Sequence, residues 1–158
     1  MSMNIIVTGC SSGIGAEIVK GFLNDGNHTV IGIARRGSEL DKIKLLSENS
    51  NAFIPIQFDL SNISEYQSLK SMILQYVPNI NILINNAGIL TNKLFEKVTK
   101  SEFDTVFNVN IKAPYFLIQS LLSLFASNSH IVNITSMGGV QGSVKFAGLS
   151  AYSASKAA

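Results

Sequence analysis

Hydrophobic and polar positions divide the chain into two kinds of segment. Short, almost unbroken apolar runs rich in β-branched residues are separated by longer stretches in which apolar residues recur every three or four positions. Unbroken runs of this length are typical of parallel strands covered on both faces, and the wider spacing is typical of amphipathic helices. Strands are therefore expected at Asn4–Thr8, Thr29–Ala34, Phe53–Phe58, Ile82–Asn85 and His130–Thr135.

The helical pattern falls between these runs. Helices are expected at Ile14–Asn24, Glu39–Ser47, Ile63–Tyr76 and Lys100–Ala126. The regular alternation of strand and helix predicts an α/β fold with a doubly wound parallel sheet and right-handed crossovers. The stretch 137–150 is rich in glycine and serine and is expected to form a loop beyond the last strand. Residues 1–158 contain no repeat or linker pattern, which predicts a single domain.

Composition and charge narrow the class of protein. The chain is 46% hydrophobic and only 14% charged, as expected for elements buried on both faces. A net charge of +2 argues against nucleic acid or an anionic membrane surface as a partner. No run approaches the roughly 18 to 20 apolar residues of a membrane span, and no leader is expected because the chain enters a strand at once.

Cysteine and histidine are too few for metal or disulfide chemistry. The chain has one cysteine, Cys10, and two histidines, so neither a disulfide framework nor a zinc cluster is expected. We therefore predict no metal site. A reducing, cytoplasmic location is the plain interpretation of this cysteine content.

A glycine cluster follows the first strand. Gly9, Gly13 and Gly15 lie between that strand and an amphipathic helix. Glycines there permit a tight turn and close approach of a ligand, and the helix N-terminus offers free N–H groups to a pyrophosphate. This placement favours dinucleotide binding over a glycine-rich connection without a ligand. A Walker phosphate loop is excluded because Ala16 stands where its lysine would follow.

Several motifs occur together in one order along the chain. They are Thr8-Gly9-x-x-x-Gly13-x-Gly15, Asp59, the NNAG run Asn85–Gly88, Asn110 within NVN, Ser136 after a strand, and Tyr152-x-x-x-Lys156. In these motifs the chain resembles the short-chain dehydrogenase/reductase family. The resemblance covers the whole chain but only the N-terminal part of the family's domain. It implies a C-terminally incomplete, Rossmann-like sheet in the order 3-2-1-4-5, with the fifth strand at an open edge.

The end of the second strand is expected to select the nicotinamide cofactor. An acidic residue there would bind the adenine ribose hydroxyls and repel a 2′-phosphate. The stretch VIGIARRGSEL instead presents Arg35 and Arg36, and a guanidinium suits phosphate oxygens. Ser11 and Ser12 could add hydroxyl donors. These residues favour NADP(H), with NAD(H) as the alternative cofactor and a solvated basic turn as the alternative interpretation.

The resemblance also assigns the remaining cofactor contacts. It implies that Asp59 and Leu60 border the adenine and that the backbone of Asn86 to Gly88 lines the adenosine and ribose path. Asn85 is interpreted as a structural brace between strands. The full set of expected cofactor contacts is Gly9, Ser11, Ser12, Gly13, Ile14, Gly15, Arg35, Arg36, Asp59, Leu60, Asn86, Ala87, Gly88, Tyr152 and Lys156.

Four residues are expected to carry the chemistry. Tyr152 and Lys156 lie one turn apart on the same helix face, and a nearby cation favours the phenolate that shuttles protons. Ser136 would orient a carbonyl and stabilise charge developing on its oxygen. The resemblance implies that Asn110 bends its helix and holds a water that relays protons to the lysine. Taken alone, the tyrosine and lysine would be an incidental surface pair.

Three functions follow as hypotheses. The first is an NADP(H)-dependent oxidoreductase acting on a small-molecule carbonyl or secondary alcohol. The second is a cofactor-binding module without turnover, because the C-terminal substrate region is missing from this chain. The third is a fragment that associates with partners through the helix expected at Lys100–Ala126. That helix is apolar around most of its circumference, which predicts a homodimer or homotetramer, with Leu121 as an outward-facing position.

Overall fold

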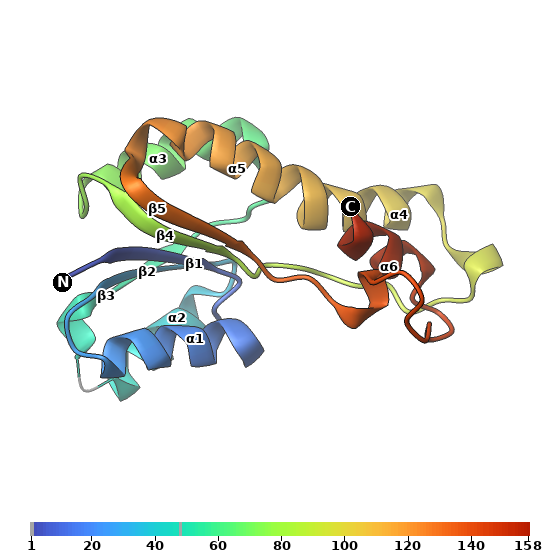
Figure 1. The fold of residues 1–158 in the computed structure, drawn as a ribbon, viewed down its shortest axis with the longest axis horizontal. Helices are drawn as coiled ribbons and strands as arrows, with labels where there is room; N and C mark the ends of the chain where they lie inside the picture. Colours follow the sequence, from blue (N-terminus) through green and yellow to red (C-terminus); the bar gives the residue numbers. More distant parts are fainter. Residues whose placement is uncertain (1, 48) are drawn as a thin grey trace.

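The computed structural model describes residues 2–47 and 49–158 and contains a parallel five-stranded sheet. The sheet has the order β3-β2-β1-β4-β5, so the expected Rossmann-like topology is confirmed (Figure 1). Its strands are β1 (Asn4–Thr8), β2 (Thr29–Ala34), β3 (Phe53–Gln57), β4 (Ile80–Asn85) and β5 (Phe125–Asn133). β5 forms an edge, and its Ile131 and Val132 are about two-fifths exposed.

Helices cover both faces of the sheet. They are α1 (Gly13–Asn24), α2 (Gly37–Leu46), α3 (Tyr66–Leu74), α4 (Lys100–Phe107), α5 (Ala113–Leu121) and α6 (Ser150–Ala157). Helices α1 and α2 lie against one face, and α3 and α5 lie against the other (Figure 1). Helices α4 and α6 lie together beyond the carboxyl ends of the strands, and the chain ends there with α6 (Figure 1).

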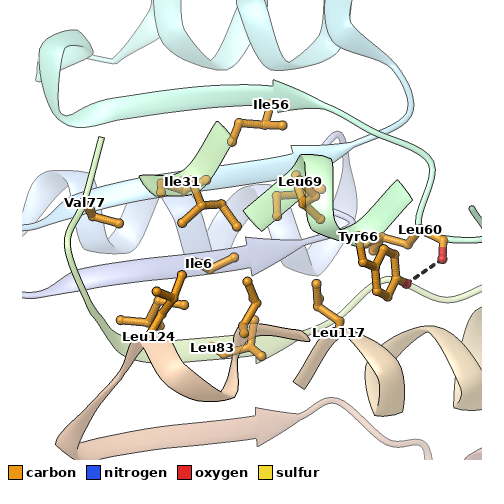
Figure 2. Packing of buried hydrophobic residues seen from close by; sticks show 14 of the residues in the cluster. Ile6, Ile31, Ile56, Leu60, Tyr66, Leu69, Val77, Leu83, Leu117 and Leu124 are labelled. Carbon is orange, nitrogen blue, oxygen red and sulfur yellow. Dashed lines mark hydrogen bonds between the residues drawn. The ribbon is translucent and has the colours of Figure 1, made fainter. Parts of the chain in front are cut away.

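The core consists of two apolar layers because strand side chains alternate between faces. On β1, Ile6 packs on the α3/α5 side, whereas Ile5 and Val7 pack on the α1/α2 side, and all three are fully buried. Figure 2 shows the first layer, in which Leu69 and Leu117 from helices meet the strand residues. The hydroxyl of Tyr66 donates to the Leu60 carbonyl at 2.6 Å there, which fixes the loop after β3.

The expected helix Lys100–Ala126 is wrong in its extent. Helix α4 ends at Phe107, a π-helical segment runs over Asn108–Lys112, and α5 ends at Leu121 before a 3-10 turn. The interruption has a local cause: Pro114 has no N–H to donate to the Asn110 carbonyl four residues earlier. Beyond the turn, Phe125 pairs with Ile80, so β5 begins five residues before the expected strand and ends two residues short of Thr135.

The predicted outward position Leu121 is also wrong. Leu121 is fully buried because α5 turns Ala113, Leu117 and Leu121 towards the sheet at a spacing of four residues. The extra residue in the π segment shifts the helix phase, which a continuous pattern starting at Lys100 does not anticipate. Large apolar side chains on the outer surface are instead Tyr115 and Leu122, 64% and 66% exposed.

Other boundaries differ by one to three residues. β3 ends at Gln57, β4 begins at Ile80, and a 3-10 turn precedes α3. The stretch after β5 is largely loop, as expected, with a 3-10 turn at Met137–Gly139. No helix in the described part of the chain combines the length and the apolar character needed to cross a bilayer.

Candidate cofactor cleft and active site

The turn after β1 requires glycine at two places. Gly9 has φ +67°, and a Cβ built on it would lie 2.6 Å from the Ala87 Cα. A Cβ on Gly15 would collide with the side-chain amide of Asn86. The absence of side chains therefore lets the β1 turn pack directly against the loop after β4, which keeps the space above the turn open.

Hydrogen bonds hold these two loops together. The Thr8 hydroxyl accepts from the backbone N–H groups of Asn86 and Ala87, both at 3.0 Å. The side-chain amide of Asn86 in turn donates to the carbonyls of Thr8 and Gly9 at 3.0 and 3.1 Å. Asn85 donates to the Asn133 side chain at 2.9 Å and so links β4 to β5. The carboxyl ends of the central strands are thus fixed relative to one another.

A cleft of about 370 Å³ lies at this end of the sheet. Its position outside the carboxyl ends of parallel strands is where open α/β sheets bind ligands. Eleven of the predicted cofactor residues line it: Gly9, Ser11, Ser12, Ile14, Arg35, Arg36, Asp59, Leu60, Asn86, Ala87 and Gly88. Gly13 and Gly15 open α1 beside the cleft, whereas Tyr152 and Lys156 are on α6.

The wall formed by the end of β2 is basic. Arg36 donates from one guanidinium nitrogen to the hydroxyls of Ser11 and Ser12, at 3.0 and 2.9 Å. Arg35 is exposed and also lines the cleft. The carboxylate of Asp59 accepts from the N–H and hydroxyl of Ser61 at 2.9 and 2.8 Å, which orders the loop after β3.

Asn110 clamps the loop after β4 to the π-helical segment. Its side-chain oxygen accepts from the Ile89 N–H and its amide donates to the Ile89 carbonyl, both at 2.9 Å. The same amide nitrogen donates to the Ser155 hydroxyl at 2.8 Å, which reaches α6. This three-way arrangement accounts for an asparagine inside a helical region, where asparagine is otherwise unfavourable.

Lys156 lies beside this clamp. Its ammonium donates to the Ile134 carbonyl at 2.7 Å, and burial lowers the pKa of the amine. A Cβ placed on Gly88 would lie 3.4 Å from both the Lys156 Nζ and the Asn110 Oδ1. The structure therefore brings Lys156 and Asn110 together at Gly88, which itself lines the cleft.

Ser136 and Tyr152 are held by the packing of α6. The Ser136 hydroxyl accepts from the Gly138 N–H at 3.1 Å and begins the 3-10 turn after β5. That turn packs tightly on α6, because a Cβ on Gly139 would collide with the Lys156 carbonyl. Tyr152 is half-buried one helical turn before Lys156. All four predicted catalytic residues thus belong to segments that meet around α6 and the π segment.

Three residues of this region were not predicted to serve it in these ways. They are Ser155, which joins Asn110 to α6, Gly139, which allows the close approach of the 3-10 turn, and the side chain of Asn86, which ties two loops together. The glycine pair in SMGGV and the small side chain between Tyr152 and Lys156 were available signals for two of them. No cluster of metal-ligating side chains occurs within residues 2–47 and 49–158.

Burial also determines the reactivity of Cys10, which lies in the glycine turn. The side chain is fully buried in the core layer on the α1/α2 side of the sheet, and burial raises the pKa of the thiol to about 12. The thiolate is the reactive form of cysteine, so Cys10 is a packing residue rather than a nucleophile.

The sheet order, the glycine turn and the cleft define a Rossmann-like α/β protein. A family described as short chain dehydrogenase matches residues 3–158, and the chain belongs to this family. Its members are oxidoreductases that use NAD(P)(H).

Two similar proteins show how far the match extends. A 2-dehydro-3-deoxy-D-gluconate 5-dehydrogenase of Dickeya dadantii is 29% identical, over 97% of this chain and 60% of that protein. A ketoacyl reductase HetN of Nostoc sp. is 34% identical, over 97% of this chain and 53% of that protein. The chain therefore spans a little over half the length of these curated relatives.

Solved structures agree with this fold. A short-chain dehydrogenase from Streptomyces avermitilis has 33% identity and a TM-score of 0.88, covering 99% of this chain and 56% of that one. A putative short chain dehydrogenase from Escherichia coli CFT073 complexed with NADPH has 28% identity and a TM-score of 0.87, covering 98% and 65%.

Proposed function

We propose that the whole protein transfers a hydride between NADP(H) and a carbonyl or secondary alcohol substrate. The observation that carries the proposal is the meeting of Lys156 and Asn110 at Gly88, on the border of the cleft. A lysine with a pKa lowered by burial, fixed beside a dinucleotide-type cleft, is the arrangement expected of a proton-handling site.

The residues of the cleft fit a dinucleotide. Gly9 has a left-handed conformation and carries no side chain over the turn, and Ser12 and Ile14 at the N-terminus of α1 line the same cleft. Gly13, Ile14 and Gly15 would hold the pyrophosphate through backbone N–H groups. Asp59, Leu60 and residues 86–88 would line the adenosine and ribose path.

The basic wall supports NADP(H) over NAD(H). Arg35 and Arg36 would hold the 2′-phosphate, and Ser11 and Ser12 already accept hydrogen bonds from Arg36. The end of β2 supplies no carboxylate, which would bind the ribose hydroxyls of NAD(H) and repel a 2′-phosphate. The similar short chain dehydrogenase from Escherichia coli CFT073, whose structure is complexed with NADPH, supports this choice.

The bound cofactor would supply or accept the hydride, and the residues of the chain handle the proton. Tyr152 donates a proton to the carbonyl oxygen during reduction and removes it in the reverse direction. Lys156 favours the phenolate through its positive charge and holds the nicotinamide ribose. Ser136 orients the carbonyl and stabilises charge on its oxygen, while Asn110 fixes the loop that carries Gly88.

The names of similar proteins support this substrate class. One is a 5-dehydrogenase of 2-dehydro-3-deoxy-D-gluconate, and others are reductases of ketoacyl or 3-oxoacyl groups. Each name describes the interconversion of a carbonyl and a hydroxyl group. We therefore propose a small molecule with a ketone or secondary hydroxyl as the substrate.

The direct test is turnover by the whole protein. We expect it to oxidise NADPH in the presence of a panel of small ketones and β-ketoesters, followed by nicotinamide absorbance, with heat-inactivated protein as the control. The 158-residue chain alone is expected to bind NADPH by isothermal calorimetry. Binding without turnover by the whole protein would favour a cofactor-binding module, and absence of both would favour a structural fragment.

We further propose that the outer face of α5 and the turn after it mediate self-association. Tyr115 and Leu122 are large apolar side chains exposed to about two-thirds on this surface. Replacing Leu122 by aspartate is expected to weaken a dimer or tetramer at least thirtyfold, roughly the cost of an unpaired charge in an interface. Light scattering across a concentration series measures this effect.

Leu45→Asp is the matched control for this experiment. Leu45 is 83% exposed on α2, on the opposite face of the sheet, and the same change there should leave the assembly intact. A parent protein that is monomeric at micromolar concentration, or equal dissociation by both variants, contradicts the proposal.

A further inference from the structure

Ser155 is a buried polar residue whose hydroxyl is fully engaged. The residue is only 3% exposed. Its hydroxyl donates to the Tyr152 carbonyl at 2.7 Å and accepts from the Asn110 amide at 2.8 Å. Ser155 lies three residues after Tyr152 and directly before Lys156. Its hydrogen bonds therefore attach this turn of α6, which bears both side chains, to the π-helical segment.

The contacts form one continuous path through three segments. The Asn110 side-chain oxygen accepts from the Ile89 N–H, and its amide nitrogen donates to both the Ile89 carbonyl and the Ser155 hydroxyl. Ile89 follows Gly88, the residue at which the Lys156 ammonium and Asn110 converge. A shift of α6 relative to the π segment would therefore move Lys156 relative to the cleft.

A second contact holds α6 independently of Ser155. The 3-10 turn after β5 packs on the backbone of Lys156 at Gly139, at a distance that tolerates no Cβ. Loss of the Ser155 hydroxyl would leave this packing in place but remove the hydrogen bond that sets the position of α6 against Asn110. The helix would stay attached while losing its fixed orientation.

We infer that Ser155 is a positioning residue that sets the orientation of the α6 turn carrying Tyr152 and Lys156. The inference rests on the proposed function, since it assigns Ser155 a task within that site. Ser155 acts through Asn110 and through the backbone of Tyr152, and it touches no reacting atom. Its side chain is almost completely buried between α6 and the π segment, where both of its hydrogen bonds are made.

The test compares Ser155→Ala with Ser150→Ala in the whole protein. Ser150 is an exposed serine at the start of α6, so the same chemical change is made on the same helix. We expect Ser155→Ala to lower kcat about tenfold, roughly the effect of one lost buried hydrogen bond, and to change the NADPH dissociation constant less than about twofold. Ser155→Cys keeps the shape of the side chain with a somewhat larger atom that hydrogen-bonds weakly, and should give an intermediate kcat.

A double-mutant cycle with Asn110→Ala tests the path itself. If Ser155 acts through Asn110, adding Ser155→Ala to Asn110→Ala should lower kcat by much less than tenfold. Multiplicative effects would overturn the inference. So would a kcat of Ser155→Ala equal to that of Ser150→Ala, or a loss that only follows the unfolded fraction measured by circular dichroism. An inactive parent protein would overturn the proposed function and this inference together, whereas the other outcomes overturn the inference alone.

Discussion

Tyr152→Phe is expected to lower the rate at which the whole protein reduces a carbonyl substrate by about 100- to 10,000-fold, the usual contribution of a general acid. The phenylalanine ring would occupy the same half-buried position on α6, so packing against neighbouring segments is retained. Only the hydroxyl that supplies the proton is removed. The NADPH dissociation constant should change less than about threefold, because the glycine turn and the arginine wall lie elsewhere in the structure. Steady-state kinetics and calorimetry measure the two quantities.

Tyr76→Phe is the matched control for Tyr152. Tyr76 is 55% exposed in the loop after α3 and should give parental kinetics when its hydroxyl is removed. Residual turnover of Tyr152→Phe within tenfold of the parent would show that another group supplies the proton. A large loss of NADPH affinity in the same variant would instead indicate a structural role for the hydroxyl.

The sheet could be predicted because its signals are local. Ile5, Ile6 and Val7 form an unbroken apolar run, which suits a strand buried on both faces, and the structure buries all three completely. Right-handed crossovers then leave few possible strand orders, and the family resemblance selects one of them. The glycine turn was similarly predictable, since Gly9 and Gly15 occur where backbone segments approach too closely for a side chain.

The region around the π segment could not be predicted from helical periodicity. An apolar run from Phe103 to Phe125 is compatible with one long helix, and the pattern alone does not show where a strand begins. Asn110 and Pro114 together indicate the interruption, because one side chain can bond outside the helix and the other lacks an N–H. The exposure of Leu121 depends on the helix phase after that interruption, so the periodic prediction placed it on the wrong face.

Hydrogen bonds between side chains were the hardest feature to predict from the sequence. Arg35 and Arg36 were both predicted to contact the cofactor, but the sequence did not show that Arg36 donates hydrogen bonds to Ser11 and Ser12. The proposed role of Ser155 likewise depends on its hydrogen bond from the Asn110 amide, which lies 45 residues earlier in the chain. Such contacts depend on rotamers and on the packing of distant segments, which a single sequence does not encode in a readable pattern.

Arg35→Asp is expected to reverse the cofactor preference of the cleft. We propose that the parent binds NADPH more tightly than NADH, because Arg35 lies exposed on the cleft wall where it would meet the 2′-phosphate. The substitution removes a charge-assisted contact and places a carboxylate near the phosphate. NADPH affinity should therefore fall about 100-fold, while NADH, which lacks that phosphate, should bind equally well or better through its ribose hydroxyls. Titration calorimetry with both cofactors measures the ratio.

Two further variants separate the local contact from the general loss of positive charge. Lys42→Asp makes the same charge change on an exposed residue of α2 outside the cleft lining, and should lower both affinities equally and only slightly. Arg36→Asp also removes the hydrogen bonds to Ser11 and Ser12, so it should weaken NADPH binding while disturbing the turn after β1. If Arg36→Asp reverses the preference and Arg35→Asp does not, the 2′-phosphate contact belongs to Arg36. If the parent binds NADH as tightly as NADPH, the cleft has no cofactor preference, and the assignment of the basic wall as the selector of the cofactor is wrong.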